Sequence, residues 1–514
     1  MCNPSYRGEQ PVRLSAHGPD NGAGFSTKAD WFLPLGPRER KTALRVTDHA
    51  MKIGGQRVPH KTVLLVLSDS VLIVIGLLLA SGLRLYQSGL FLGGFEGMRT
   101  VLRFGVVVLV CELSLYYHDL YDFQILKRHS EMFARLLQAF GISCAVLALC
   151  YYVHPPLSFG RGIAALAAPT ILAFALGWRL LLDKADALLH RPERVLIVGT
   201  GPAGISLTRE IISRPELNLK VVGFLDEKGE NIGKSLVNPG IIGAVSEVSS
   251  IADMQKVDRI VLSLAERRGC TPSQQLLHLK FAGVPVEDAH SCYERISGRI
   301  LLERLSPSWL ILSSGFRKSA FVLACKRVVD IVAALVGLVL SAPVMAAVAV
   351  AIWSETGSPI LFRQTRIGLF GRHFQILKFR SMYQNAEAGG PSWAAQDDRR
   401  ITRVGAFIRK SRLDELPQLF NVLRGDMSLV GPRPEQPHFV TLLQQSIPFY
   451  DQRHTVRPGI TGWAQIKYQY GASLEESKVK LELDLFYIKH LSTLLDLAII
   501  FETVKVMLLG RGAK

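Results

Sequence analysis

Four apolar stretches in the first third of the chain constrain its fold more than any other feature. From Val63 to Leu83 the sequence has 21 residues and one charged side chain, which matches the roughly 20 residues that cross a hydrocarbon core as a helix. Three further apolar stretches follow, at 104–117, 136–153 and 162–182. Glu112 interrupts the first of these and Pro169 the last. The sequence therefore predicts four transmembrane helices within residues 62–183.

Composition agrees with a membrane protein that also has folded domains. Hydrophobic residues make up 48% of the 514 residues and charged residues 20%, and the mean hydropathy is +0.23, which excludes a mainly disordered chain. The net charge of +17 favours anionic partners such as lipid headgroups, nucleotide phosphates or nucleic acid. Seven scattered cysteines without a Cys-x-x-Cys pair suggest neither a disulfide framework nor a thiolate metal site.

Basic residues predict the orientation of these helices, because Lys and Arg accumulate on the cytoplasmic side. They occur before the first apolar stretch, between the second and third, and after the fourth (Lys52, Arg57, Lys61, Lys127, Arg128, Arg135, Lys184, Arg191, Arg194). Residues 1–61 are rich in Gly, Pro and charge and are predicted to form a flexible tail. We expect this tail and everything after residue 183 to be cytoplasmic.

Residues 190–300 are predicted to form a Rossmann-like α/β domain with a parallel sheet. Short β-rich runs at 194–198, 221–225 and 259–263 alternate with helix-length segments, as in parallel α/β folds. No Tyr-x-x-x-Lys pair occurs in the chain, so the catalytic couple of short-chain sugar-nucleotide dehydrogenases is absent.

A glycine pattern follows the first of these strands. It reads Gly199-Thr-Gly201-Pro-Ala-Gly204, and Asp226 ends the next strand. In a dinucleotide site, such glycines let the backbone approach a pyrophosphate at a helix N-terminus, and the acid accepts a hydrogen bond from a ribose hydroxyl. The alternative is that the glycines only permit a tight turn in a domain that binds no nucleotide.

A fifth apolar run, from Ile331 to Trp353, poses a topological problem. It has 23 residues, but a full crossing would place the C-terminal residues outside the cell although both flanks are basic. Pro343, in its middle, lacks an amide donor and clashes with the preceding turn, so we expect a kink. A re-entrant helix over 328–353, returning to the same face, resolves the conflict. An ordinary kinked transmembrane helix is the alternative.

An acidic pair and several basic residues alternate with rigid turns between residues 377 and 463. The pair is Asp414-Glu415, and the basic residues include Lys378, Arg409, Arg433 and Arg457. Phosphoryl transfer uses this mixture, because cations neutralise the phosphate oxygens while carboxylates hold a metal ion. A carboxylate can also act as the nucleophile. Taken alone, Asp-Glu is more often a solvated pair on a helix.

Four motifs in this region carry a closer resemblance. They are KFRSM at 378–382, LDELPQLFNVL at 413–423, GDMSLVGPRP at 425–434 and VRPGITGW at 456–463. Residues 320–514 resemble the monotopic polyprenol phosphoglycosyl transferase family, the bacterial sugar transferases. The whole chain resembles its long members, the undecaprenyl-phosphate glucose phosphotransferases.

The resemblance implies roles for individual residues. It makes Asp414 the nucleophile and Glu415 the ligand of a magnesium ion (Mg2+). Four basic residues are expected to grip phosphates of donor or acceptor (Lys378, Arg409, Arg433, Arg457). Pro343 matches the helix-breaking proline of a re-entrant hairpin, although Ala342 stands where family members often have serine.

The implied reaction transfers hexose-1-phosphate, glucose-1-phosphate first, from a UDP-sugar to undecaprenyl phosphate and releases UMP. A covalent aspartyl-phosphosugar intermediate is expected, as the initiating step of exopolysaccharide, capsule or O-antigen synthesis at the bacterial inner membrane. The alternatives are a galactose-1-phosphate transferase and a membrane-tethered nucleotide-binding regulator. Membrane lipids are expected partners, nucleic acid is not, and a homo-oligomer is left open.

The expected fold is thus a membrane protein of α plus α/β class. It combines a four-helix transmembrane bundle, a Rossmann-like module and a C-terminal catalytic domain at 320–514 with a re-entrant hairpin. Near the end of the chain, 485–509 has apolar runs interrupted by charged residues. This pattern suits helices that lie in the membrane interface or, equally, an amphipathic helix packed on a core.

Overall fold

The structure is a computed structural model, and the residues it describes begin at Met51. The described ranges are 51–53, 56–58, 60–87, 97–126, 128–189, 191–264, 272–302, 305, 307–316, 318–384, 400–468 and 473–508. Most of the tail predicted at 1–61 lies outside them. Its last residues form an antiparallel pair of short strands, β1 (Met51–Ile53) and β2 (Gln56–Val58).

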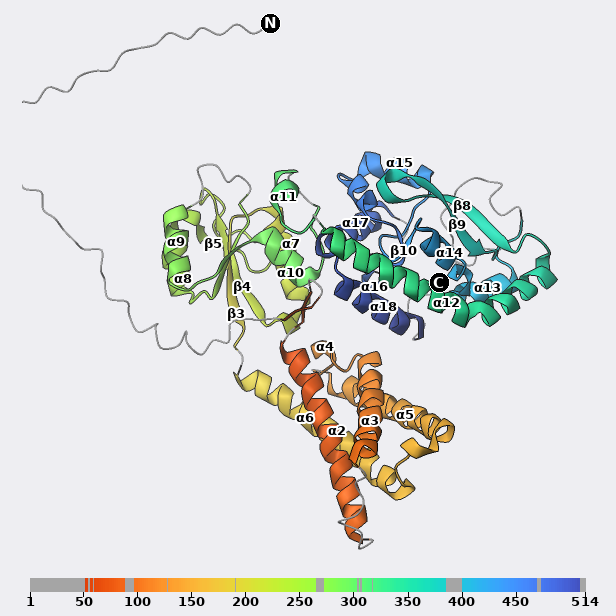
Figure 1. The fold of residues 1–514 in the computed structure, drawn as a ribbon. Coiled ribbons are helices and arrows are strands. Elements are labelled where there is room, and N and C mark those ends of the chain that lie inside the picture. Colours follow the sequence, from red (N-terminus) through yellow and green to blue (C-terminus); the bar gives the residue numbers. More distant parts are fainter. Residues whose placement is uncertain are drawn as a thin grey trace, which may run out of the picture. The chain divides into compact units, whose positions relative to one another are not determined.

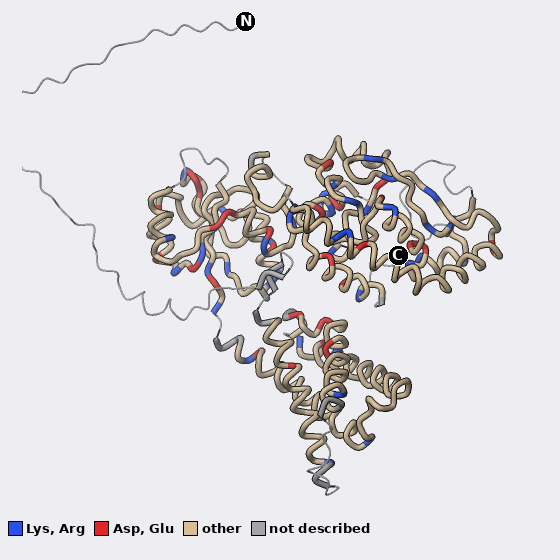
Figure 2. The backbone as a smooth tube through the Cα atoms, viewed as in Figure 1, with Lys and Arg blue, Asp and Glu red and all other residues tan. Residues whose placement is uncertain are grey.

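Four long helices follow, one for each predicted apolar stretch. They are α2 (His60–Gln87), α3 (Gly97–Tyr117), α5 (His129–Val153) and α6 (Arg161–Leu189), with the short helices α4 (Phe123–Leu126) and η1 (Pro155–Leu157) between them. Each is longer than its apolar stretch. Among the described residues, these four and α12 (Ala320–Thr356) are long and apolar enough to cross a membrane. Figure 2 shows how few charged residues the four helices carry. The chain is a membrane protein.

The polar residues inside these helices have partners. Asp69, the single charge of the first apolar stretch, is buried against Arg179 of α6, whose Nη1 and Nη2 donate to its two carboxylate oxygens at 3.0 and 2.8 Å. Glu112 of α3 accepts hydrogen bonds from the hydroxyls of Ser70 and Tyr121, both at 2.6 Å. Buried charges in apolar surroundings are tolerated when they are paired in this way. The acidic residues Asp69 and Glu112 are therefore compatible with the predicted transmembrane helices.

A five-stranded sheet forms the next part of the chain. Its strands are β3 (Glu193–Val198), β4 (Leu219–Asp226), β5 (Ile241–Ala244), β6 (Arg259–Leu262) and β7 (Val286–Asp288). They are all parallel, in the order β5-β4-β3-β6-β7. The expected parallel α/β architecture is confirmed.

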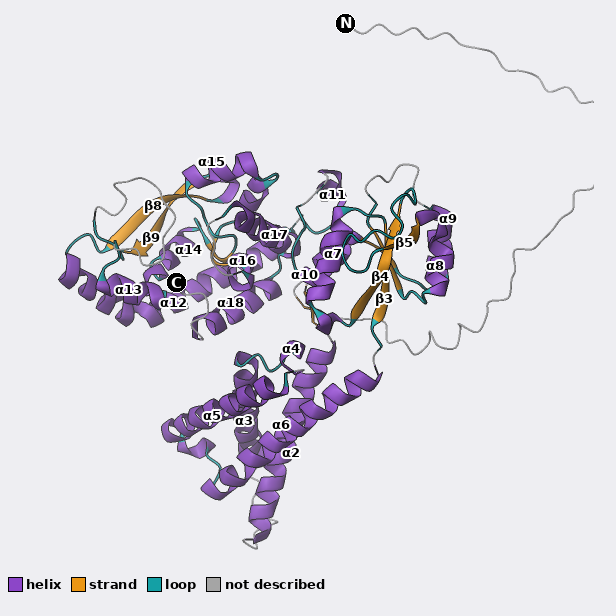
Figure 3. Ribbon diagram, turned by 180° about the vertical axis from the view of Figure 1, so that it is seen from behind, coloured by secondary structure: helices purple, strands orange, loops and turns teal. Residues whose placement is uncertain are grey.

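Helices cover both faces of this sheet (Figures 1 and 3). On one face lie α7 (Pro202–Ser213) and α10 (Ala289–Ser297), and on the other α8 (Val248–Met254) and α9 (Ser273–Phe281). Two short 3-10 helices lie between helices and strands of this part, η2 (Pro215–Leu217) between α7 and β4 and η3 (Val245–Glu247) between β5 and α8. Because both faces are buried, the strands read as nearly continuous apolar runs.

The C-terminal part contains a long helix, a hairpin and a series of short elements. After α11 (Pro307–Leu312) and α12 come β8 (Leu361–Ile367), η4 (Leu369–Gly371), β9 (His373–Phe379), α13 (Arg403–Lys410), η5 (Leu413–Glu415), α14 (Gln418–Arg424) and β10 (Ser428–Val430). Then follow α15 (Pro437–Ser446), η6 (Tyr450–Thr455), β11 (Gly459–Thr461), α16 (Trp463–Lys467), α17 (Leu474–His490) and α18 (Thr493–Leu508).

Helix α18 has two apolar faces. Leu495 and Ile499 are buried in the core of the C-terminal part. A second stripe, spaced three or four residues apart, is exposed (Leu494, Leu497, Phe501, Val504). One face therefore packs on the core, as an amphipathic helix would. The exposed stripe suits an interface, although Phe501 within it also contacts the rings of Tyr116 and Tyr117 of α3.

Helix α12 continues through Pro343 and is longer than the predicted 328–353. Its ribbon bends part-way along (Figure 1). Ala334, before the proline, packs in a cluster with Ile376 of β9 and Val422 of α14. Val348 and Ile352, after the proline, pack on Phe379 and Ile408. Both halves of the helix thus contact the same group of elements.

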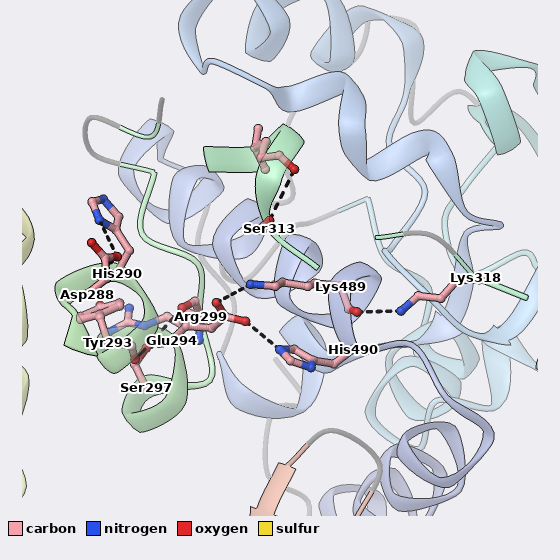
Figure 4. Close-up of polar contacts among 11 residues, drawn as sticks. Asp288, His290, Tyr293, Glu294, Ser297, Arg299, Ser313, Lys318, Lys489 and His490 are labelled. Atoms are coloured by element: carbon pink, nitrogen blue, oxygen red, sulfur yellow. Dashed lines mark hydrogen bonds and ion pairs between the residues drawn. The ribbon is translucent and has the colours of Figure 1, made fainter. Parts of the chain in front are cut away.

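The last helix of the α/β part, α10, is joined to α17 by buried charges (Figure 4). The Glu294 carboxylate lies 2.7 Å from Lys489 Nζ and 2.7 Å from His490 Nε2. Burial alone would raise the pKa of Glu294, but these two partners outweigh it and hold the pKa below its ordinary value. Trp463 Nε1 also donates to the Gly298 carbonyl at 2.9 Å.

Candidate active site

The acidic pair lies on a single 3-10 turn between two helices. Helix α13 ends at Lys410, and Arg412 adopts a left-handed conformation with φ of 56°. This reverses the chain, so that Asp414 and Glu415 emerge on η5 directly before α14. Both acids are partly buried. Leu413 and Leu416, which flank them, pack on the cluster around Phe379 and Ile408.

Two of the predicted basic residues meet at Glu415. Arg433 Nη2 donates to Glu415 Oε1 at 2.8 Å, and Lys378 Nζ lies 3.5 Å from the same oxygen. Burial would raise the pKa of Glu415, but Arg433 and Lys378 hold it well below its usual range. Glu415 is therefore ionised at neutral pH, and its charge is compensated by two cations from distant segments.

The pKa of Asp414 shifts in the opposite direction. Burial raises it, and the neighbouring Glu415 charge adds to that effect, while Lys378, Arg433 and Arg409 oppose it. The pKa of Lys378 is lowered, chiefly by burial. Adjacent carboxylates whose environments push their pKa values apart are typical of sites where the two groups have different roles.

Arg409, in the last turn of α13, carries an unused donor. Its Nη1 is buried and has no hydrogen-bond partner among the described residues. A buried guanidinium donor left unpaired is costly, so the position favours an anionic ligand.

Arg433 and Arg457 lie on two turns that pack against each other. Strands β10 and β11, which adjoin these turns, are parallel, with Ser428 opposite Gly459. Gly459 N donates to the Pro432 carbonyl at 2.9 Å, and a side chain at Gly431 would collide with the Arg457 carbonyl. Arg457 Nε donates to the Gly425 carbonyl at 3.0 Å. The backbone at Arg457 thus packs on the turn of Arg433, while the Arg457 side chain bonds to Gly425 and, among the described residues, makes no hydrogen bond or ion pair with the acidic pair.

Sequence reasoning missed three residues that position this site. Asn421 is fully buried; its Oδ1 accepts from Leu377 N at 2.9 Å and its Nδ2 donates to the Gln375 carbonyl at 2.7 Å, which fastens α14 to the strand of Lys378. Asp330 and Lys326 hold β10 to α12. Asp330 directly precedes the apolar run at 331–353, and a carboxylate at the edge of such a run is the signal that could have marked it.

The glycine pattern of the α/β part lies elsewhere, at the start of α7. Gly201 N donates to the Ser263 carbonyl and Gly204 N to the Ser263 hydroxyl, both at 2.8 Å. At Gly199, φ is +101° and a Cβ would collide with the same carbonyl. These glycines allow the turn to pack against the residue that follows β6.

Asp226 is buried at the end of β4. Its carboxylate accepts from the backbone and side-chain nitrogens of Asn231, each at 3.4 Å. Neither this acid nor the glycines contact the acidic pair. Their predicted nucleotide binding stays a prediction.

Pro343 and its neighbours can be placed as well. Pro343 lies inside α12, and Ser341, one turn before Met345, places its hydroxyl 3.4 Å from the Met345 sulfur. A hydroxyl is thus present at the proline, one position earlier than in the family pattern.

Comparison with known proteins identifies the relationship. Residues 321–510 match the family model of the bacterial sugar transferases, and residues 116–270 match that of a CoA-binding domain. The UDP-glucose:undecaprenyl-phosphate glucose-1-phosphate transferase of Escherichia coli (strain K12) is 35% identical over 328 residues, which cover 61% of this chain and 68% of the relative. The chain belongs to the bacterial sugar transferase family.

The names of two other relatives specify different sugars. A UDP-N-acetylgalactosamine-undecaprenyl-phosphate N-acetylgalactosaminephosphotransferase of Aeromonas hydrophila is 45% identical over 239 residues, covering 46% of this chain and 56% of that protein. An undecaprenyl-phosphate glucose phosphotransferase of Komagataeibacter xylinus is 33% identical over 340 residues, covering 63% and 62%. The chain therefore spans less than two thirds of the length of these two relatives.

Proposed function

We propose that this protein transfers hexose-1-phosphate from a UDP-sugar to undecaprenyl phosphate and releases UMP, as the initiating step of polysaccharide assembly. The observation that carries the proposal is the acidic pair, in which a charge-compensated Glu415 lies beside Asp414 within reach of Lys378 and Arg433. Family membership and the names of the relatives support the substrates.

The reaction has two balanced displacements at phosphorus. In the first, a carboxylate oxygen of Asp414 bonds to the sugar-linked phosphorus, and the bridging bond of the diphosphate breaks so that UMP leaves with the electron pair. In the second, a phosphate oxygen of undecaprenyl phosphate bonds to the same phosphorus and the aspartyl oxygen leaves. Lys378, Arg433 and Arg409 stabilise the charge on the phosphate oxygens throughout.

The carboxylates of this site fit a magnesium ion that is bound partly by the protein and partly by the substrate. No group of three or more His, Cys, Asp or Glu side chains gathers around a metal position within the described ranges. Mg2+ usually takes one or two carboxylates and completes its shell with water and substrate phosphates. Glu415, with Asp414 beside it, would hold the ion, and the ion would offset charge on the diphosphate. We expect a chelator to stop UMP release and added magnesium to restore it.

We propose that α12 is re-entrant and that the catalytic part lies on the cytoplasmic face of the inner membrane. The packing of both halves of α12 against one group of elements supports this, because a transmembrane helix would have that group at one end only. The exposed apolar residues between the two packed regions are suited to the bilayer (Leu335, Val336, Val339, Leu340, Val344). The basic flanks favour the same arrangement.

Glucose is the first sugar to test, and N-acetylgalactosamine the second because of the Aeromonas relative. The experiment incubates the purified full chain in detergent or nanodiscs with magnesium and UDP-glucose, UDP-galactose or UDP-N-acetylgalactosamine, and measures UMP before and after undecaprenyl phosphate is added. We expect one donor to give stoichiometric UMP first and turnover afterwards. The absence of UMP with every donor, even with acceptor present, would contradict the proposal.

The unpaired donor of Arg409 gives a separate prediction. Replacing Arg409 with Gln removes a charged hydrogen bond to a donor phosphate, and we expect kcat/KM for the UDP-sugar to fall by roughly 10- to 100-fold. Lys410→Gln, at the neighbouring exposed residue, serves as the control and should stay within about twofold of wild type. Equal kinetics for the two variants would remove Arg409 from the phosphate site.

A further inference from the structure

Three successive backbone carbonyls of the turn that carries Arg433 accept hydrogen bonds. The carbonyl of Arg433 itself accepts from Arg453 Nη2 at 3.0 Å. The next carbonyl, at Pro434, accepts from Arg366 Nη1 at 3.1 Å, and the one after it from Ile367 N at 3.0 Å. The donors belong to β8 and η6, which lie far from this turn in the sequence. The turn is therefore held from outside, and the contact to Arg433 comes from Arg453.

The sequence around Arg433 limits what else can vary there. Arg433 stands between Pro432 and Pro434, and both prolines have a fixed φ. A residue before proline is confined to extended conformations. What remains variable is the rotation of the peptide plane that contains the Arg433 carbonyl, and a hydrogen bond to that carbonyl restricts it. Arg453 thus acts on the torsion that the prolines leave variable.

Arg453 is a buried cation with a support of its own. It is 6% exposed, and its Nη2 lies 2.9 Å from Oδ2 of Asp484, a buried residue of α17. Its Nη1 donates to the hydroxyl of Tyr450, which is also buried. A buried ion pair is weak evidence for stability, because an apolar pair of similar volume is often as stable. A role in placing Arg433 accounts for a charge at this position.

The other end of Arg433 is held at the acidic pair. Its Nη2 donates to Glu415 Oε1 at 2.8 Å, and Asp414 is the preceding residue. An arginine side chain has several rotatable bonds and loses much conformational entropy when it is fixed. Its guanidinium keeps one position best when the backbone is fixed at one end and the head at the other. Arg453 provides the first of these constraints and Glu415 the second.

We propose that Arg453 is a positioning residue for the donor step, which holds the Arg433 carbonyl so that the Arg433 guanidinium stays beside the acidic pair. Asp484 belongs to the same support, because it fixes the Arg453 guanidinium. The inference rests on the proposed function, in which Arg433 stabilises charge on the phosphate oxygens. Arg453 acts through Arg433 and is not itself a contact of the substrate.

The test variant is Arg453→Lys, which keeps a positive charge opposite Asp484. Lysine presents its donors at a single nitrogen, so it cannot reach Asp484, the Tyr450 hydroxyl and the Arg433 carbonyl together. The experiment measures UMP released in a single turnover without acceptor, on the full chain in nanodiscs with magnesium and increasing UDP-sugar. We expect the donor-step rate constant to fall roughly 10- to 100-fold, since a displacement of about 1 Å at a positioning group has effects of that size.

A positioning role predicts that this loss depends on the Arg433 guanidinium. Arg433→Gln removes the guanidinium and keeps the carbonyl, so adding Arg453→Lys to Arg433→Gln should change the donor step by no more than about twofold. A general loosening of the fold would lower the rate by the same factor in both backgrounds. Equal factors would overturn the inference, and so would a donor step in Arg453→Lys that matches wild type.

Asp484→Asn is the second variant, for use if Arg453→Lys does not fold. Asparagine keeps an oxygen that can accept from Arg453 Nη2 but lacks the charge, so we expect a smaller loss of roughly three- to tenfold. This loss should again vanish in Arg433→Gln. The control is Arg259→Lys, at a buried arginine of β6 whose Nε lies 2.7 Å from Glu193 Oε1. Its donor step should stay within about twofold of wild type, whatever its melting temperature, because it is remote from the acidic pair.

Chemical modification of Arg433 tests the positioning without relying on the reaction. Phenylglyoxal reacts with accessible guanidinium groups, and peptide mass spectrometry gives the rate at each arginine. In Arg453→Lys we expect the rate at Arg433 to rise roughly three- to tenfold, because its charged hydrogen bond to Glu415 is weakened. Arg372, which is exposed, serves as the internal reference and should not change.

An unchanged modification rate at Arg433 in Arg453→Lys would overturn the inference. A wild-type protein that releases no UMP with any donor would instead refute the proposed function. The modification rate would still show whether Arg453 places Arg433, so the two failures are distinguishable.

Discussion

Replacement of Asp414 with Asn is expected to abolish the covalent phosphosugar adduct and to lower UMP release by at least about 1,000-fold. The amide has the shape of the carboxylate but no nucleophilic oxygen of comparable strength, so the first displacement cannot occur. Asp414 is partly buried and its own pKa is raised chiefly by burial, so a neutral side chain should be tolerated there. The measurement is intact-protein mass after mixing with UDP-sugar and magnesium, followed by peptide mapping.

The Asp414→Asn experiment has a matched control at another carboxylate. Asp451→Asn removes a carboxylate from an exposed position on η6 and should leave the adduct unchanged. Matching thermal unfolding of Asp414→Asn and wild type would exclude misfolding as the cause of the loss. An adduct that persists in Asp414→Asn and maps to Glu415 would exchange the roles of the two acids. UMP release that persists without any adduct would favour direct transfer between donor and acceptor.

The membrane helices and the sheet were predictable because each rests on a local pattern. The stretch at 63–83 is continuously apolar because a helix that crosses a bilayer needs apolar residues on every side, and the strand at 194–198 is apolar because both faces of its sheet are covered. Helix ends were less predictable. The bilayer fixes the length of the apolar stretch, but backbone hydrogen bonding continues the helix into polar residues, so α5 begins at His129 although its apolar stretch begins at 136.

The site was only partly predictable, because its geometry depends on contacts between distant segments. The motifs named Asp414, Glu415 and the basic residues, but they did not indicate that Glu415 Oε1 is held by Arg433 and Lys378. The glycine pattern shows the same limitation. It is typical of pyrophosphate binding, yet two of its amides donate to Ser263, about 60 residues later in the chain. A local sequence pattern does not show which distant residues will contact it in the folded chain.

The buried contact between α12 and the Arg433 turn belongs to this unpredicted class. Lys326 Nζ donates to the Val430 carbonyl at 2.9 Å and lies 2.8 Å from Asp496 Oδ2, and the Tyr487 hydroxyl donates to Asp496 Oδ1 at 2.7 Å. One turn along α12, Asp330 Oδ1 accepts from the Ser428 hydroxyl and from Leu429 N, both at 3.0 Å. Strand β10, which ends just before Gly431, is thus fixed to the helix that we propose is anchored in the membrane.

Lys326→Met is therefore expected to destabilise the C-terminal part by about 3–5 kcal/mol, because it leaves the buried Asp496 carboxylate without its cation. The melting temperature in detergent should fall by roughly 6–20 °C. Lys478→Met, at an exposed lysine of α17, should change stability by no more than about 0.5 kcal/mol. Replacing both partners, as in Lys326→Met with Asp496→Leu, should restore much of the loss, since an apolar pair of similar volume needs no compensation.

The double variant also separates stability from catalysis. If the network serves only to stabilise the fold, Lys326→Met with Asp496→Leu should recover UMP release together with its melting temperature. If it also positions β10, the double variant should melt like wild type and still release UMP more slowly, because the Val430 carbonyl has lost the Lys326 donor that holds the strand before Arg433. We expect the second result. Full recovery of activity would mean that packing alone places the Arg433 turn, and an unchanged melting temperature in Lys326→Met would show that the buried ion pair contributes nothing to stability.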